Sequence, residues 1–541
     1  MKNIFTILLL SAGAYCMAQN TPAWVRYSTP SNYENYDVRE VSTGTDSIGN
    51  IYTSASMYDS INNLSKIMLV KYNTLGTQQW MQLYDYNNST YNGSYAVTLL
   101  IDKAGNSYVC GYGRGTTTNG KDFMVLKYNN AGTQLWAKYW DGGQSLSDYI
   151  TCATFDKSGN IVVAGYANTM GTTWDDLAVV KYSTAGTQLW SYTYNNAPVN
   201  GEDRALGIAS DASDNIYVTG SSYGTVSRDM ITLKLNSSGT NQWVKRMAHG
   251  TSSDDDRGYS IAADAVGNSY VTGAVNDWIT VKYDPSGNVL WTNSYTANDL
   301  NRYSVKKVML DKANNVIVGT DVFVSSNQHF SDLGIVKLNN ATGASIWATT
   351  FNNSGIDTFE DFVLDTMGNI YVAGAYDGPI GKDMSTMILS PAGIILWNTT
   401  FSNALNTRGG DMPYQIATDN NRNVILAGVS ETRGSGSGSN VDVVTLKFGT
   451  QGITGIQTTE NKAAHLNVYP NPAKNYVTLS VSDESFNHAS ITLYNMLGDV
   501  LVKDVLNTQE QSIDLGNLAK GVYVLTIQGA KETLSKKLVV E

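Results

Sequence analysis

Residues 156–166 read DKSGNIVVAGY, and close copies of this stretch recur along the chain. DKAGNSYVCGY at 102–112, DASDNIYVTGS at 211–221 and DTMGNIYVAGA at 365–375 share an Asp, an Asn four residues later and a short apolar run. The Asp accepts hydrogen bonds from nearby backbone N–H groups, and Gly or Asn adopts a positive φ, so the first five residues predict a tight turn. The run that follows is rich in β-branched and aromatic residues and predicts a strand.

The pattern D-x-x-x-N occurs eight times, and such a period indicates a repeat architecture. The copies begin at Asp46, Asp102, Asp156, Asp211, Asp264, Asp311, Asp365 and Asp419. A second stretch, VVKYSTAGTQLW at 179–190 in one unit, has a counterpart in each of the first seven units and ends in Trp. These residues are Trp80, Trp136, Trp190, Trp243, Trp291, Trp347 and Trp397. We expect each Trp to wedge between neighbouring units.

The eighth unit lacks its Trp, because the chain reads FGTQGITGIQTT after Lys447. Trp24, in AWVRYSTP, supplies a matching residue near the other end of the chain. The sequence therefore predicts one unit that is split between the two ends of the repeat region. Its outer strand around Trp24 would pair beside Lys447 and remove the exposed sheet edges.

Each unit contains four predicted strands, which in the second unit cover 94–102, 106–113, 122–129 and 133–140. Four strands in each unit of roughly 40–55 residues, repeated eight times, predict an all-β, eight-bladed β-propeller. The D-x-x-x-N turns join strands one and two of a blade. The composition agrees, since charged residues make up only 15% and Gly (49) and Tyr (34) are abundant.

The repeats resemble the SBBP beta-propeller repeats of secreted bacterial proteins over about residues 22–450. That family's label specifies seven blades, whereas this sequence contains eight units. The Gly-to-Trp turn alone is similar to the tryptophan-docking motif of quinoprotein propellers.

The repeats stop before residue 466, and alternation such as Val477-Leu479-Val481 predicts a small C-terminal β-sandwich. This tail resembles the type A C-terminal sorting domain of the type IX secretion system of Bacteroidetes. The resemblance rests on YPNP (469–472), LYNMLGDVL (493–501), LAKGVYVL (518–525) and KKLVV (536–540). The motif residues are Tyr469, Pro470, Asn471, Pro472, Gly498, Gly521, Lys536 and Lys537. The resemblance implies the type IX machinery as a partner, removal of the tail, and either release or attachment to surface lipopolysaccharide.

The first residues, MKNIFTILLLSAGAYCMA, predict a secretory signal peptide over 1–18. The expected organisation is this signal, a propeller over 20–450, a linker over 451–465 and the sorting domain over 466–541. No other segment is apolar enough to span a membrane. We expect a secreted or outer-membrane-surface protein, monomeric once processed.

Charge and motif content exclude several functional classes. The net charge of −11 argues against a nucleic-acid partner. The four His residues have no metal-ligand spacing, and we expect no cofactor, with Ca²⁺ as the one alternative. Cys110 and Cys152 either pair or lie as buried thiols, and both alternatives stay open.

Aspartates recur on the face where strands one and three begin, opposite the D-x-x-x-N turns. Five precede strand one, at Asp148, Asp203, Asp256, Asp357 and Asp411. Seven precede strand three, at Asp122, Asp176, Asp229, Asp277, Asp332, Asp383 and Asp442, and Lys66 takes this place in the first blade. Carboxylates at turns accept loop N–H bonds, whereas a ring of them near the axis attracts Ca²⁺ or a cationic ligand.

Aromatic residues accompany the acids on this face: Tyr33, Tyr36, Tyr91, Tyr95, Tyr149, Tyr303, Phe359 and Tyr414. We expect the five acids before strand one, with Tyr149, Tyr303 and Tyr414, to bind an extracellular polysaccharide or a surface protein. The favoured function is a non-enzymatic binding or adhesion module. The alternative is a polysaccharide-active hydrolase or lyase that uses carboxylates such as Asp203 and Asp256.

Overall fold

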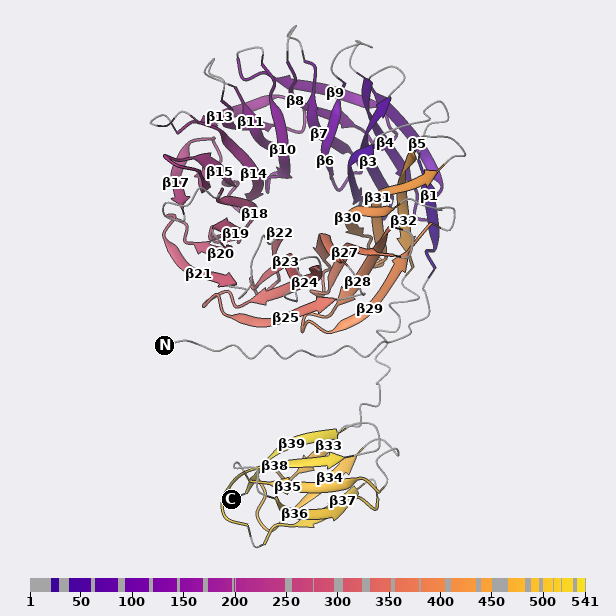
Figure 1. The fold of residues 1–541 in the computed structure, drawn as a ribbon, viewed down its shortest axis with the longest axis vertical. Helices are drawn as coiled ribbons and strands as arrows, with labels where there is room; N and C mark the ends of the chain where they lie inside the picture. Colours follow the sequence, from indigo (N-terminus) through magenta and orange to yellow (C-terminus); the bar gives the residue numbers. More distant parts are fainter. Residues whose placement is uncertain are drawn as a thin grey trace. The chain divides into compact units, whose positions relative to one another are not determined.

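The computed structural model describes most of the chain as short β-strands joined by tight turns (Figure 1). The described residues are 21–28, 38–59, 64–85, 93–115, 120–143, 146–168, 174–196, 199, 201–248, 255–275, 277–295, 305–323, 331–351, 356–378, 381–403, 410–433, 439–449, 466–481, 488–495, 500–508, 510–516, 518–528 and 533–540. In these ranges no helix is long and apolar enough to cross a membrane. The chain divides into two compact units, Met1–Gly452 and Ile453–Glu541.

The first unit is a ring of eight four-stranded antiparallel sheets, as the repeats predict (Figure 1). Blade one contains β2 (Val38–Thr45), β3 (Ile51–Asp59), β4 (Leu64–Tyr72) and β5 (Gln78–Tyr84); blade two, β6 (Tyr95–Ile101), β7 (Ser107–Gly113), β8 (Asp122–Tyr128) and β9 (Gln134–Trp140). Blade three contains β10 (Tyr149–Phe155), β11 (Ile161–Ala167), β12 (Asp176–Tyr182) and β13 (Gln188–Tyr194); blade four, β14 (Asp203–Ser210), β15 (Ile216–Tyr223), β16 (Arg228–Leu235) and β17 (Asn241–Met247).

The later blades follow the same order. Blade five contains β18 (Arg257–Ala263), β19 (Ser269–Val275), β20 (Asp277–Tyr283) and β21 (Val289–Tyr295); blade six, β22 (Val305–Leu310), β23 (Val316–Phe323), β24 (Ser331–Leu338) and β25 (Ser345–Phe351). Blade seven contains β26 (Thr358–Leu364), β27 (Ile370–Asp377), β28 (Lys382–Leu389) and β29 (Ile395–Phe401); blade eight, β30 (Asp411–Thr418), β31 (Val424–Arg433), β32 (Ser439–Phe448) and β1 (Trp24–Tyr27).

The ring closes through β1, which is the outer strand of the last blade. Trp24 pairs with Lys447 and Tyr27 with Val444 in antiparallel register. The Ala23 N–H donates to the Lys447 carbonyl at 2.7 Å. The predicted split blade is therefore confirmed.

Each D-x-x-x-N turn is held by its own Asp side chain. In blade one, Asp46 Oδ1 accepts the N–H groups of Ile48 (3.1 Å) and Asn50 (2.9 Å). Its Oδ2 accepts from the Asn50 amide at 2.7 Å and from the hydroxyl of Tyr52 at 3.1 Å. Gly49 has a φ of 86°, so the fourth position of the motif needs a residue that tolerates the left-handed region.

Tryptophans tie each of the first six blades to the next through one repeated contact, whereas Trp397 of blade seven instead packs on Phe448 of blade eight. Trp136 Nε1 donates to the Thr184 carbonyl at 3.3 Å, and Gly186 lies against the indole ring. A Cβ on Gly186 would lie 3.0 Å from the ring, so the contact requires glycine. The same donor–acceptor contact joins Trp80 to Asn130, Trp190 to Ser237, Trp243 to Pro285, Trp291 to Asn340 and Trp347 to Pro391. Trp24 packs on Gly76 of blade one, so this docking continues across the closure.

The two cysteines lie in the propeller as free thiols. Cys110 is fully buried in the core between blades two and three, and Cys152 is half-buried. The sequence left open whether Cys110 and Cys152 form a disulfide or remain free; in the structure they are free.

The second unit is a small β-sandwich of two antiparallel sheets. One sheet has the order β33 (Leu466–Tyr469), β34 (Tyr476–Val481), β37 (Glu510–Asp514). The other has the order β36 (Val500–Val505), β35 (Ser490–Tyr494), β38 (Gly521–Gln528), β39 (Thr533–Val540). Leu479, Ile491, Leu525 and Leu538 form the centre of its fully buried core. Since one face of each sheet is apolar, packing face to face removes both from water.

Candidate functional site

The face of the propeller where strands one and three begin is here called the entrance face. The Asp that precedes or opens strand one clamps the neighbouring blade there through its backbone. The N–H of Asp148 donates to the Lys121 carbonyl at 2.5 Å, and that of Asp203 to the Asp175 carbonyl at 2.7 Å. Asp256 and Asp357 make the same contact with Arg228 (2.8 Å) and Ser331 (2.7 Å).

The side chains of the five predicted ligand-binding acids are buried, at 0–2% exposure. They are Asp148, Asp203, Asp256, Asp357 and Asp411. Three of them accept a loop N–H from the end of the preceding blade: Gly142 to Asp148 (2.8 Å), Asn196 to Asp203 (2.8 Å) and Asn403 to Asp411 (2.7 Å). Such a carboxylate joins two blades. A direct contact with a ligand stays a prediction.

The acids that precede strand three are more varied. Asp122, Asp176, Asp332 and Asp383 are buried. Asp229 is half-buried and pairs with Arg246 Nη2 at 2.7 Å, whereas Asp442 is half-buried in blade eight. The side chain of Asp277 lies outside the described residues.

Four half-buried tyrosines, here called the tyrosine row, run across blades two and three on the entrance face. They are Tyr95, Tyr112, Tyr149 and Tyr166. The ring centroids are 5.0 Å apart between Tyr95 and Tyr112, 4.9 Å between Tyr112 and Tyr149, and 5.2 Å between Tyr149 and Tyr166. Such offset and edge contacts are favourable beyond the area they bury.

Two cations contact the tyrosine row, and Lys121 reaches three of its rings, including Tyr149 at 5.7 Å. Lys121 Nζ lies 4.2 Å from the ring centroid of Tyr95 and 5.3 Å from that of Tyr112. At the other end, the Arg204 guanidinium lies 4.5 Å from the ring centroid of Tyr166. Burial is the main cause that raises the pKa of Tyr166, while Arg204 lowers it, so this tyrosine is neutral at physiological pH.

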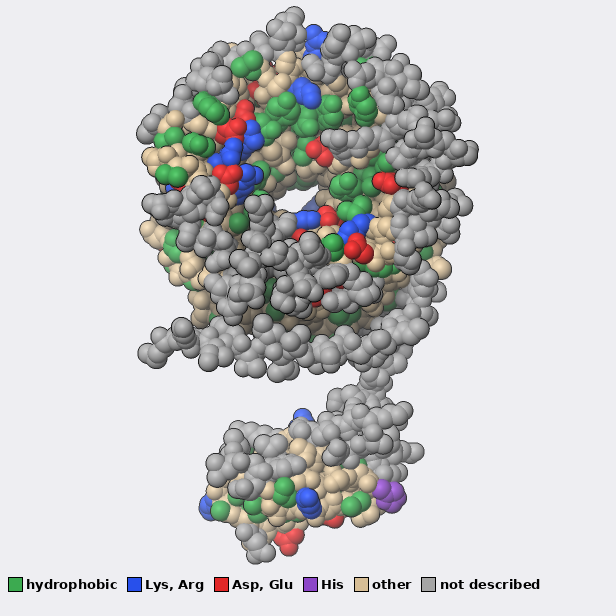
Figure 2. All heavy atoms as spheres, in the orientation of Figure 1, with side chains coloured by type: hydrophobic (Ala, Val, Ile, Leu, Met, Phe, Trp, Pro, Cys, Tyr) green, Lys and Arg blue, Asp and Glu red, His purple; other side chains and the backbone are tan. Residues whose placement is uncertain are grey.

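Ion pairs continue the row into blade four. Arg204 pairs with Asp175 at 2.6 Å and with Glu202 at 3.3 Å. Arg228 pairs with Glu202 and, at 2.7 Å, with Asp255. Figure 2 shows this gathering of acidic and basic side chains over blades three and four, beside a hydrophobic area over blade two. Trp174, 47% exposed, and Leu146, 46% exposed, lie in the loops of the same face.

The predicted aromatics are only partly in this row. Tyr95 and Tyr149 belong to it, Tyr414 is 39% exposed in blade eight, and Phe359 is fully buried. Tyr303, Tyr33, Tyr36 and Tyr91 lie outside the described residues.

Tyr112 and Tyr166 were missed, although a signal for them exists. Each is the last residue of the repeated stretch, in DKAGNSYVCGY and DKSGNIVVAGY, where other copies end in Ser221 or Ala375. A position-by-position comparison of the copies would have found them.

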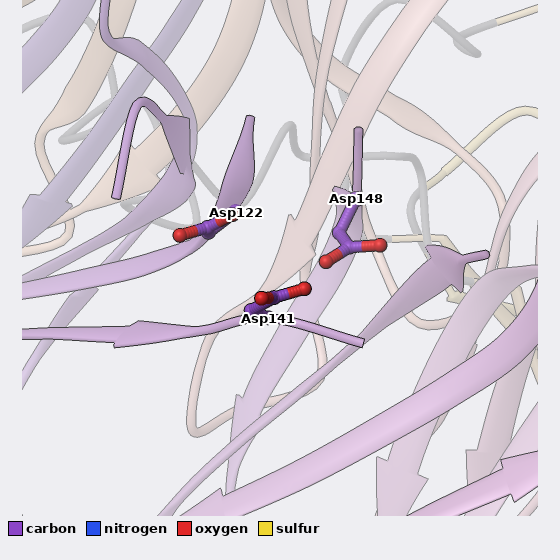
Figure 3. Close-up of side chains that lie close together, drawn as sticks. All are labelled: Asp122, Asp141 and Asp148. Carbon is purple, nitrogen blue, oxygen red and sulfur yellow. The ribbon is translucent and has the colours of Figure 1, made fainter. Parts of the chain in front are cut away.

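Three carboxylates, here called the acid cluster, meet beside the row between blades two and three. They belong to Asp122 at the start of β8, Asp141 after β9 and Asp148 before β10 (Figure 3). One oxygen from each lies within 4.8 Å of those of the other two. Burial, with a smaller contribution from Asp141, raises the pKa of Asp122 to about 6; burial also raises the pKa of Asp148 to about 7. Asp141 was not predicted from the sequence.

The sorting-motif residues lie around β39 in the second unit. The Tyr469 hydroxyl donates to Glu510 at 2.6 Å, and Asn471 Oδ1 accepts the Val539 N–H at 2.9 Å. Pro470 and Pro472 lie between β33 and β34, and Gly521 opens β38. Lys536 and Lys537 lie in β39, whereas Gly498 is outside the described residues.

Comparisons with known proteins match two parts of the chain to families. Residues 467–541 match the secretion system C-terminal sorting domain, and residues 242–274 match the beta-propeller repeat of SBBP type. Among curated proteins, an uncharacterized WD repeat-containing protein of Acanthamoeba polyphaga mimivirus is 22% identical over 422 residues, covering 62% of this chain. Beta-agarase D of Zobellia galactanivorans is 39% identical over 77 residues, 14% of this chain.

The chain spans only 28% and 15% of the lengths of these two relatives. Among solved structures, the WD40 domain of SCAP from fission yeast has a TM-score of 0.40 at 8% identity, covering 79% of this chain and 99% of that one. The chain therefore combines an eight-bladed propeller that contains a repeat of SBBP type with a C-terminal sorting domain of the type IX secretion system, and this tail indicates export to the cell surface or the medium.

Proposed function

We propose that the exported propeller is a non-enzymatic binding module, and that the tyrosine row with its flanking ion pairs is the binding surface. The observation that carries this proposal is the unbroken contact from Tyr95 through Tyr112, Tyr149 and Tyr166 to Arg204. Half-exposed Tyr and Arg are the residue types that dominate binding energy at protein interfaces. Packing them on one another reduces the conformational entropy that binding costs.

The arrangement favours a protein partner over a glycan. A sugar ring that stacks on an aromatic side chain needs an open ring face. Here Lys121 lies over Tyr95 and Arg204 over Tyr166, while the inner rings pack against each other. Ring edges, hydroxyl groups and charges of both signs are left for contact, and these match the polar rim of a protein surface.

The alternative is a polysaccharide-active hydrolase or lyase that acts through Asp203 and Asp256. Such an enzyme needs two carboxylates that touch the scissile bond from opposite sides. Asp203 is 0% exposed and accepts the Asn196 N–H, and Asp256 is 2% exposed. This burial favours the binding function.

The test uses labelled full-length protein on intact cells of a strain that lacks it, on a glycan array, and in a reducing-sugar assay. We expect saturable, protease-sensitive binding to cells that falls at least about fivefold in Arg204→Ala, with no turnover. The matched control is Leu75→Ala, which changes a residue that is 76% exposed on the opposite face. Equal binding by the two variants would refute the surface; glycan binding would replace the protein partner, and sugar release would establish the enzyme.

A further inference from the structure

Among the described residues, one carboxylate of the acid cluster has neither an ion pair nor a hydrogen bond. Asp122 is 0% exposed, and neither of its side-chain oxygens has a hydrogen-bond partner within the part of the chain that the structure describes. The backbone of Gly115 lies against this carboxylate, where a Cβ would clash with Oδ2. A buried and unsatisfied carboxylate is costly, because desolvation penalises the charge.

Within the described ranges, the other two acids of the cluster accept hydrogen bonds from backbone N–H groups only. Asp141 Oδ1 accepts the Gly143 N–H at 2.8 Å. Asp148 accepts N–H groups from Gly142 (2.8 Å) and Asn168 (3.2 Å). These contacts use single lone pairs of the oxygens, and each carboxylate oxygen has capacity for a further ligand.

The same positions between blades one and two contain a built-in cation. Asp85 follows Tyr84 as Asp141 follows Trp140. Lys66 precedes Ile67, which pairs with Tyr84, just as Asp122 precedes Phe123, which pairs with Trp140. Lys66 Nζ lies 3.5 Å from Asp85 Oδ2. Ser94, whose N–H donates to the Ser65 carbonyl as that of Asp148 does to Lys121, replaces the third acid.

Blade four supplies its cation from a different strand. Arg246 of β17 places Nη2 2.7 Å from the strand-three acid Asp229. Between blades three and four the set is Asp176, Asn195 and Asp203, in which the middle position is an amide rather than a carboxylate. Asp176 has a partner of its own. Among the described residues, three carboxylates converge only at Asp122, Asp141 and Asp148.

We propose that Asp122, Asp141 and Asp148 bind one divalent cation, with Ca²⁺ preferred. The ion takes the place that Lys66 has beside Asp85 in blade one and that Arg246 has beside Asp229 in blade four. Ca²⁺ takes six to eight oxygen ligands at about 2.3–2.6 Å, so its ligands lie within about 5 Å of one another. The three carboxylate oxygens satisfy this separation. Asp141 is half-buried, and water completes the shell on that side.

The position of the site implies that a bound ion would hold blades two and three together. Asp122 and Asp141 belong to blade two, and Asp148 begins blade three next to Tyr149. A bound ion therefore joins the two blades that carry the tyrosine row. Burial is the main cause that raises the pKa of Asp122 and Asp148, and repulsion from neighbouring carboxylates adds to it; a bound ion offsets both costs.

The test is thermal unfolding and calorimetric titration of the full-length chain, stripped with a chelator, in CaCl₂ at up to about 10 mM. We expect one Ca²⁺ per chain with a dissociation constant of about 10⁻⁴–10⁻³ M and a rise of about 2–4 °C in Tm. Asp141→Asn should abolish the calorimetric signal and the rise in Tm. Asp85→Asn, the matched variant in blade one, should retain both. MgCl₂ at the same concentration should give the smaller shift.

A second variant keeps the test independent of folding failure. Asp122→Lys reproduces the Lys66–Asp85 pair of blade one, so it should fold, lose Ca²⁺ binding and raise Tm in the absence of Ca²⁺. The proposal is overturned if wild-type protein binds no Ca²⁺ at 10 mM, or if Asp85→Asn and Asp141→Asn weaken binding equally. A larger response to Mg²⁺ than to Ca²⁺ would overturn the preference.

Discussion

The two faces of the propeller differ in how far their contacts repeat from blade to blade. On the face of the D-x-x-x-N turns, blade after blade has the same Asp contacts and the same Trp–Gly docking. On the entrance face, equivalent positions hold Lys66, Asp122 or Asp229, each with different neighbours. The comparison indicates that the uniform face sets the geometry of the ring, whereas the variable face provides the specific chemistry.

The largest effect is expected where the uniform contacts close the ring. Trp24→Ala should lower the free energy of unfolding by about 3–5 kcal/mol, because it removes a buried aromatic ring that packs on Gly76. Equilibrium unfolding in urea measures the change. Tyr27→Ala on the same strand removes a ring that is 42% exposed and should cost less than about 1 kcal/mol. Similar costs for both would show that β1 is not a closing strand.

The next effect separates backbone strain from docking within blade three. Gly186 (φ 82°) and Gly159 (φ 84°) have almost the same φ. A Cβ on Gly186 would meet Lys138 at 2.8 Å and Trp136 at 3.0 Å, whereas one on Gly159 would meet nothing within 4 Å. Gly159→Ala should cost about 1–2 kcal/mol from strain alone. Gly186→Ala should cost about 1–3 kcal/mol more, from the clash. Thermal or urea unfolding of the two variants gives the difference, and no difference would argue against docking as a source of stability.

A smaller effect is expected on the variable face, and on binding rather than folding. Tyr166→Ser introduces the residue that blade four has at the equivalent position, Ser221. It should weaken binding to cells about tenfold, equal to about 1.4 kcal/mol, since it leaves Arg204 without its ring. The unfolding midpoint should move less than in Trp24→Ala. Unchanged binding with lowered stability would assign the tyrosine row to folding alone.

The smallest expected effect is a dependence of stability on pH in the absence of divalent cations. Burial raises the pKa of Asp122 to about 6 and of Asp148 to about 7 in the folded state, above the ordinary value near 4. The folded chain therefore holds protons that the unfolded chain has lost, and stability falls as the pH rises from about 4 to about 7. We expect Tm in a chelating buffer to fall by a few degrees over this range.

Asp141→Asn is the control for this pH dependence, because Asp141 contributes to both raised pKa values. Its Tm should fall less over the same pH range. An equal fall in wild type and variant would place the titration elsewhere in the molecule.

The fold followed from the sequence to the level of single strands, because its determinants are local and repeated. The Asp of each turn accepts hydrogen bonds from residues two and four positions later, so a short stretch of sequence is enough to predict the contact. The eighth blade was predicted because Trp24 supplies the Trp that the eighth repeat lacks. The pairing of Trp24 with Lys447 confirmed this prediction.

The candidate site was less predictable because it depends on which way side chains face. Asp148 and Asp203 precede or open strands near the axis, but they turn inward to accept loop N–H groups. Asp141 belongs to no repeated motif, and only the fold brings it to Asp122. Lys121 and Arg204 contact tyrosine rings on other strands, and the spacing of these residues along the chain does not predict such contacts.

The pairing of Trp24 with Lys447 has a consequence for the order of assembly. The two residues are separated by roughly 420 positions, so the ribosome has released β1 long before its partner strand exists. Until then β1 has no strand to pair with, although Tyr72 and Gly76 of blade one, on which Trp24 packs, are already present. An unpaired strand is the kind of segment that is prone to aggregate. Closure of the ring therefore needs the last blade, and a chain truncated within that blade should leave its first strand open to proteases.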